Sequence, residues 1–122
     1  MRKIWSAAAA LALMGSGTAF AQAAPDGGAL FKQRCQMCHT VTPGQIHGLG
    51  PSLAGVAGRK AASTDFPYSP ALRKSGLVWN PATLDKFLAA PGALVPGTRM
   101  TISVSDPRQR AAIVAFLGNR KK

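Results

Sequence analysis

Residues 31–41 read FKQRCQMCHTV and hold the only two cysteines of the chain, Cys35 and Cys38, with His39 directly behind the second. Three chemistries fit part of this motif. A redox dithiol is expected at a helix start that follows a strand. A zinc site needs about four ligands, to which His47 could add one. A disulfide across two residues would be strained and would leave His39 unexplained. A fourth chemistry, covalent attachment of haem, uses both thiols as thioethers and the adjacent histidine as an iron ligand.

The beginning of the chain is typical of an export signal. Arg2 and Lys3 precede an apolar stretch over residues 4–14. This stretch has about 11 residues, whereas a membrane-spanning helix needs about 20, so we expect a cleaved signal rather than an anchor. Small residues predict cleavage after Ala21, or alternatively after Ala23. Residues 22–122 then form one periplasmic domain with no spanning helix.

The mature chain is strongly basic. Without Arg2 and Lys3, 13 of the 15 basic residues remain against 4 acidic ones, so the net charge is about +9. Such a charge indicates an anionic partner. Export and the scattered placement of the basic residues argue against nucleic acid. An acidic docking partner and a merely solvated basic surface both remain.

Four helices are predicted from their starts. Each follows a capping residue, and three of them have proline at the first position. The caps are Asp26, Ser69, Asn80 and Asp106, and the helices cover residues 27–38, 70–76, 81–90 and 107–122. Only MTISVS, residues 100–105, is a short strand candidate. The sequence therefore predicts an all-α fold of about four to five helices.

The glycine-rich segment over residues 40–67 predicts a long loop. Loops of this length are uncommon in a compact domain unless they serve a function. A domain of this size is also marginal without an added staple, and one disulfide at most is available. An apolar cofactor would supply the missing core and give the loop something to enclose. Covalent haem at Cys35 and Cys38 is therefore the favoured interpretation, with His39 on the iron.

The second axial ligand of such an iron would be Met, His, Lys or water. Met1 and Met14 leave with the signal, and Met37 lies within the attachment motif, too close to reach the opposite face. Met100 remains, in the proline-glycine segment VPGTRMTIS. His47 lies in the same loop as His39, so we expect it to hydrogen-bond the backbone instead.

Two segments resemble class I cytochromes c of the mitochondrial type and their periplasmic bacterial relatives. They are CQMCHTVTPGQIHGLGPSLAGVAGRK, residues 35–60, and LVPGTRM, residues 94–100. The resemblance covers nearly the whole mature chain. It implies one covalent haem c, with Cys35 and Cys38 as the thioether sites, His39 as the proximal ligand and Met100 as the distal ligand.

The resemblance also implies supporting roles. The carbonyl of Pro51 would accept a hydrogen bond from the far ring nitrogen of His39 and fix its tautomer. Arg59, Tyr68 and Trp79 match residues that surround the haem propionates.

Gly27 and Phe31 match the contact of the first helix in this family, where they would meet Ile113 and Phe116 of the last helix. The resemblance therefore implies that the two ends of the mature chain pack together.

This chain departs from the family's pattern in several places. Phe87 stands where a tyrosine hydroxyl usually lies near the methionine sulfur. Gly48 and Gly92 occupy positions where mitochondrial homologues have lysines around the haem edge. Arg34 and Arg99 remain as the basic residues nearest the ligands.

With two protein ligands on the iron, the resemblance implies a one-electron carrier rather than an enzyme. It would be monomeric and would shuttle between membrane-bound redox complexes (an oxidase, reductase or reaction centre) through a basic face. Two alternatives stay open. One is a haem c subunit fixed to an oxidoreductase, and the other is a peroxidase or gas-sensing haem protein in which Met100 dissociates.

Overall fold

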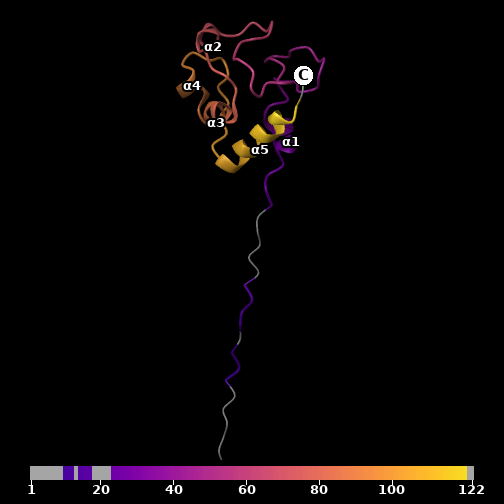
Figure 1. Ribbon diagram of the computed structural model, residues 1–122, viewed down its shortest axis with the longest axis vertical. Helices are drawn as coiled ribbons and strands as arrows, with labels where there is room; N and C mark the ends of the chain where they lie inside the picture. Colours follow the sequence, from indigo (N-terminus) through magenta and orange to yellow (C-terminus); the bar gives the residue numbers. More distant parts are fainter. Residues whose placement is uncertain (1–9, 13, 18–22, 121–122) are drawn as a thin grey trace, which may run out of the picture.

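The computed structural model describes residues 10–12, 14–17 and 23–120. Most of the predicted export signal, including the predicted cleavage after Ala21, lies outside the described residues. Leu11 and Met14 are almost fully exposed. In Figure 1 the described residues 10–12 and 14–17 lie away from the folded part. The prediction of cleavage therefore stays a prediction.

Residues 23–120 form five helices, which confirms the predicted all-α fold. They are α1 (Gly27–Arg34), α2 (Pro70–Lys74), α3 (Pro81–Ala89), α4 (Pro91–Leu94) and α5 (Pro107–Gly118). Among the described residues there is no strand, and the one isolated bridge joins Lys60 and Val78. The strand suggested over residues 100–105 was wrong. In this segment the Val104 N–H donates to the carbonyl of Leu88, near the end of α3. The segment therefore pairs with a helix and not with another strand.

The predicted helix starts are confirmed. The Asp26 carboxylate accepts hydrogen bonds from the first-turn N–H groups of α1. The Ser69 hydroxyl caps α2 and the Asn80 side chain caps α3, accepting from the N–H of the third helical residue in each case. Asp106 caps α5 through the Arg108 N–H at 2.8 Å. Local capping alone therefore marks where these helices begin.

The predicted helix ends were less accurate. The first helix was expected to reach residue 38, but α1 ends at Arg34 and Cys35 is its C-cap. The following turn is closed by the N–H groups of Cys38 and His39, which both donate to the Cys35 carbonyl. The last helix ends at Gly118 rather than at the C-terminus, and α4 was not predicted.

The first and last helices pack against each other at one end of the domain (Figure 1). A Cβ on Gly27 would lie 2.1 Å from the backbone oxygen of Ala112, so only glycine allows this approach. The rings of Phe31 and Phe116 lie 5.4 Å apart between centroids. The contact implied by the resemblance is therefore confirmed.

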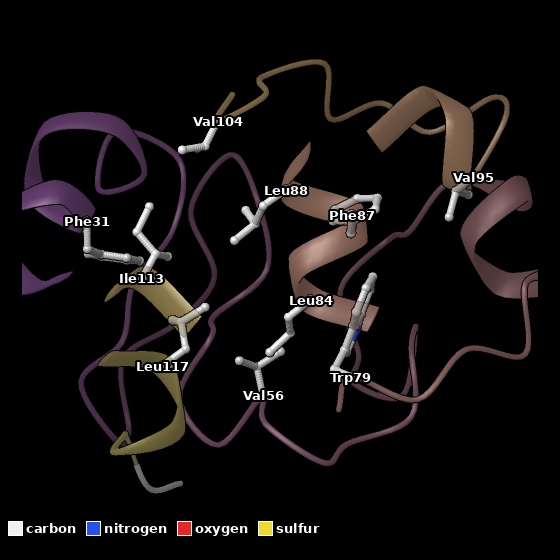
Figure 2. Packing of buried hydrophobic residues seen from close by; sticks show 10 residues of the cluster. All are labelled: Phe31, Val56, Trp79, Leu84, Phe87, Leu88, Val95, Val104, Ile113 and Leu117. Atoms are coloured by element: carbon white, nitrogen blue, oxygen red, sulfur yellow. The ribbon is translucent and has the colours of Figure 1, made fainter. Parts of the chain in front are cut away.

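Helix α3 packs on α5 and on α4 and completes the core. Figure 2 shows Phe31 beside Ile113 and Leu117, with the apolar side chains of α3 facing the same interior. Across the described residues, none of the helices combines the length and apolar composition that crossing a bilayer requires.

Candidate functional site

A cavity of about 680 Å³ lies inside this helical shell, within the range of about 300–1,000 Å³ typical of cofactor pockets. Its wall is mostly apolar and includes much of the core described above. The core residues that line it are Phe31, Val56, Trp79, Leu84, Phe87, Leu88, Val104, Ile113 and Leu117. Most core residues therefore line the cavity as well as contacting one another.

All four predicted site residues line this cavity. Cys35, Cys38 and His39 come from the turn after α1, and Met100 comes from the loop after α4. The segments are far apart in the sequence, and the fold brings them to one space. Sequence reasoning therefore selected residues that do converge.

The structure weakens the competing interpretations of the cysteines. Cys35 and Cys38 are not joined by a disulfide. No strand precedes the motif within the described chain, as a redox dithiol would require. Among the described residues, no group of three or more His, Cys, Asp or Glu side chains gathers to hold a metal ion, so a zinc site has too few ligands.

The thiol of Cys35 is not tuned for redox reactivity. Its burial raises its pKa, and this effect outweighs the lowering by Arg34, while Cys38 raises the pKa further. Reactive dithiols need the opposite shift, because the thiolate is the nucleophile.

The imidazole of His39 is held in one orientation. Its Nδ1 donates a hydrogen bond of 2.7 Å to the carbonyl of Pro51, as the resemblance implied. This leaves Nε2 as the ring nitrogen available to a metal. Burial lowers the pKa of His39, although the bond to Pro51 opposes this shift. A neutral ring is the form that can ligate iron, so the environment favours a ligand over a cation.

Gly50 lets the chain pass directly against this imidazole. A Cβ at this position would lie 2.6 Å from the Cε1 atom of His39 and 2.9 Å from its Nδ1. Any side chain at residue 50 would therefore displace the ring that the Pro51 carbonyl orients.

Replacing Gly50 with alanine is expected to lower the free energy of unfolding by about 1–3 kcal/mol, because the added methyl group overpacks the site. The shifted ring should also change the optical spectrum of the loaded protein. Urea unfolding and absorption spectra would measure both effects. Gly92→Ala is the control, since nothing lies within 4 Å of a Cβ there. Equal unfolding midpoints for the two variants would contradict the expected crowding.

The loop that carries Met100 is held by two hydrogen bonds, one at this residue and one at the residue before it. The Met100 N–H donates to the hydroxyl of Thr98, and an Arg99 guanidinium N–H donates to the carbonyl of Pro67 at 2.9 Å. The second bond joins two loops that both line the cavity. The sequence could not predict this bond, because its acceptor is a backbone carbonyl and every residue has one.

The residues matched to the propionate surroundings also converge on the cavity. Arg59 donates from its guanidinium to the carbonyls of Ser52 and Ala54. The Tyr68 hydroxyl contacts the Thr64 hydroxyl, and Trp79 lies in the core. Arg59, Tyr68 and Trp79 line the same space, as the resemblance implied, and bring a guanidinium group and a phenol hydroxyl to a mostly apolar wall.

Phe87, which departs from the family's tyrosine, is 8% exposed and lies against Trp79, with ring centroids 5.0 Å apart. Its side chain brings no hydroxyl to the cavity. The packing is therefore apolar at the place where the family pattern would put a polar group.

His47 was expected to hydrogen-bond the backbone, and it does. Its Nδ1 accepts the N–H of Ser52 at 2.8 Å. Its Nε2 meets the carboxylate of Asp65 at 2.7 Å, a contact that the sequence did not indicate. The hydrogen bond from His47 is the largest cause of a lowered pKa at Asp65. This pair joins two distant parts of the long loop.

The Asp65 contact gives an expected pH dependence. Because its folded-state pKa lies below the ordinary value of 3.8, the contact contributes stability above that value. The contribution is lost as pH falls through the lower, folded-state pKa. Asp65→Asn should therefore lose less stability on acidification than the parent, in thermal melts from about pH 6 to pH 2. His47→Gln should behave like Asp65→Asn, and the double variant like either one. Parallel curves for parent and Asp65→Asn would show that this exposed pair contributes nothing.

The cavity fits a haem group chemically. An apolar wall suits the porphyrin, two free thiols suit thioether attachment, and an oriented neutral imidazole and a thioether suit the iron. The fold and the site together therefore define a small all-α protein that encloses a covalently bound haem.

Comparisons with known proteins agree. The chain matches the Cytochrome c family over residues 24–121. It is 41% identical to cytochrome c2 of Rhodomicrobium vannielii over 122 residues, which span 98% of both chains. It is 42% identical over 99 residues to cytochrome c2 of Rhodoblastus acidophilus, covering 80% of this chain and 92% of that one. The solved structure of cytochrome cH from Methylobacterium extorquens aligns with a TM-score of 0.72 at 38% identity, covering 79% of this chain and 100% of that one.

The chain therefore belongs to the cytochrome c family and is similar to cytochromes c2. It is an electron carrier with covalently bound haem c, and its cytochrome c2 homologues are electron carriers rather than enzymes.

Proposed function

We propose that this protein is a periplasmic one-electron carrier with His39 and Met100 as axial ligands, which shuttles between membrane-bound redox complexes. The observation that carries this proposal is the convergence of both side chains on one cavity, with the second ring nitrogen of His39 already bonded to Pro51. The similarity to cytochromes c2 supports the partner class.

The bound haem iron supplies the one-electron chemistry. The chain's own residues hold it in a fixed environment. Cys35 and Cys38 attach the group, His39 stays neutral and oriented, and the Met100 loop is fixed by Thr98 and Arg99. If His39 and Met100 both bind the iron, they would leave no position on it for a substrate. Such an arrangement can change charge with little movement of the protein.

The proposal includes the processing of the chain. Cleavage after Ala21, or after Ala23, would release residues 22–122 as the cytochrome c domain into the periplasm. Mass spectrometry of the exported protein would identify the new N-terminus.

Docking would use the basic surface of the mature chain. Arg34 and Arg99 both line the cavity and are exposed. An acidic partner that approaches the cavity would therefore meet both side chains. We propose that the protein acts as a monomer that binds its partners transiently.

Electron transfer to a purified bacterial cytochrome c oxidase is expected to slow as salt is added. Long-range attraction should raise the encounter rate about 10-fold or more at low ionic strength. Screening should remove much of this gain at about 0.15 M, where the Debye length is near 8 Å. The double variant Arg34→Gln/Arg99→Gln should be slower at low salt and less sensitive to salt.

The matched control is Lys60→Gln/Lys86→Gln, which removes the same charge away from the cavity lining. If both double variants behave alike, only the net charge matters and the basic docking face is wrong. An absence of transfer by the parent, combined with ready binding of carbon monoxide, would favour a gas-binding protein. Purification only as part of a complex would favour a fixed subunit.

A further inference from the structure

The side chain of Arg110 joins three segments of the fold, one of which follows Met100 in the chain. Arg110 lies near the start of α5, and its side chain is 15% exposed. Its Nε donates to the carboxylate of Asp85 in α3 at 2.8 Å. Its Nη1 donates to the backbone carbonyls of Val104 at 3.0 Å and Ser105 at 2.9 Å. One guanidinium group therefore links α3, α5 and the loop after Met100.

This loop is anchored on the C-terminal side of Met100 at Val104. Residues 101–103 are exposed, whereas Val104 is 2% exposed and its N–H donates to a carbonyl of α3 at 2.8 Å. The hydrogen bonds of residues 98–100 described above form the other anchor. Met100 therefore lies between two fixed points, and Arg110 holds the second of them.

Arg110 is not among the residues that line the cavity, so it acts on the site only through this loop. The ion pair with Asp85 contributes little by itself, because the carboxylate is 46% exposed and solvated. The two bonds to backbone carbonyls have a charged donor and are stronger than bonds between neutral groups. These two bonds are therefore the main link between Arg110 and the loop.

We propose that Arg110 is a positioning residue for Met100, which limits how often the thioether leaves the iron by fixing the segment after it. This inference rests on the proposed axial ligation. Without the two carbonyl bonds the loop would open more often as a local unit, while the rest of the domain stays folded.

The open fraction can be measured with an external ligand. Imidazole can bind the iron only when Met100 has left it. The apparent affinity for imidazole therefore rises in proportion to the fraction of molecules in which the loop is open.

The test is the binding of imidazole to the oxidised, haem-loaded protein, followed by optical absorption. Each net hydrogen bond changes an equilibrium by roughly 2- to 10-fold, so Arg110→Gln should raise the affinity about 5-fold or more. Arg110→Lys keeps the charge and one long donor, and it should raise the affinity about 2-fold. Hydrogen exchange of the Val104 amide should be faster in both variants, because this N–H lies in the segment that opens.

Asp26→Ala is the matched control. It also removes two hydrogen bonds between a side chain and the backbone, at the start of α1. It should lower the urea unfolding midpoint, as Arg110→Gln does, because α1 loses its cap. Its affinity for imidazole and its Val104 exchange should stay at the parent values. A purely structural role of Arg110 would change the unfolding midpoint alone.

The proposal is wrong if Arg110→Gln lowers the unfolding midpoint but keeps the parent's imidazole affinity, as the control does. If Arg110→Gln does not fold, Arg110→Lys decides, and an affinity equal to that of the parent overturns the proposal. Met100→Ala gives the affinity of a fully open site. A parent that binds imidazole as tightly as Met100→Ala would instead contradict the axial ligation in the proposed function.

Discussion

Replacing Cys35 and Cys38 with alanine is expected to leave the exported chain without covalent haem and without a stable fold. The reason is that the cavity and the core share most of their residues. Without the haem, the apolar side chains that line this cavity would lose their apolar partner, and full burial of one such side chain contributes about 1.5–3 kcal/mol. Small domains have a total stability of only about 5–15 kcal/mol. The variant should therefore unfold or collapse.

Mass spectrometry of the denatured protein and circular dichroism of the native protein would test this expectation. The parent should carry the added mass of one haem, and the double variant should not. Met37→Ala is the control within the same motif, because Met37 is exposed and does not line the cavity. A double variant with the parent's helix content and unfolding midpoint would show that the chain folds without its cofactor. A chain of parent sequence that carries zinc or free thiols would contradict the haem assignment itself.

Replacing Met100 with alanine should open one side of the iron and lower the redox potential. The soft thioether favours the reduced state, so its loss favours the oxidised state. We expect a decrease on the order of 0.1 V, within the range of about 0.8 V that axial ligands cover. The reduced variant should bind carbon monoxide, whereas the reduced parent should not.

Two controls accompany this prediction. Met100→Leu keeps the apolar volume but removes the sulfur, so it should behave like Met100→Ala in carbon monoxide binding. His47→Ala should leave the potential and the spectrum close to those of the parent, because both its ring nitrogens already have partners. A changed spectrum in His47→Ala together with an unchanged one in Met100→Ala would mean that the second ligand is wrongly assigned.

The parts of the fold that sequence predicted well are those decided by near neighbours. A helix start depends on a cap and the first turn, so Asp26, Ser69, Asn80 and Asp106 were sufficient to place four starts. Where a helix ends depends on its contacts with residues that are distant in the sequence. The end of α1 at Arg34 and the short helix α4 are of this kind, and both were missed.

In the candidate site, too, local signals were predicted and long-range contacts were not. The spacing of Cys35, Cys38 and His39 is a local signal, and Met100 followed from the small number of methionines. The Asp65 contact of His47 and the Pro67 contact of Arg99 join segments that only the folded chain brings together. No periodicity or spacing reports such contacts. They became visible only when the loops were placed around the cavity.

Most core residues also line the haem cavity, and this affects the amount of the protein in the cell. A chain that lacks its cofactor also lacks a core, and its apolar side chains are then open to proteases. Unloaded copies should be degraded while loaded copies persist. The amount of protein would then follow the supply of haem without a dedicated regulator, because degradation itself removes every copy that could not carry an electron.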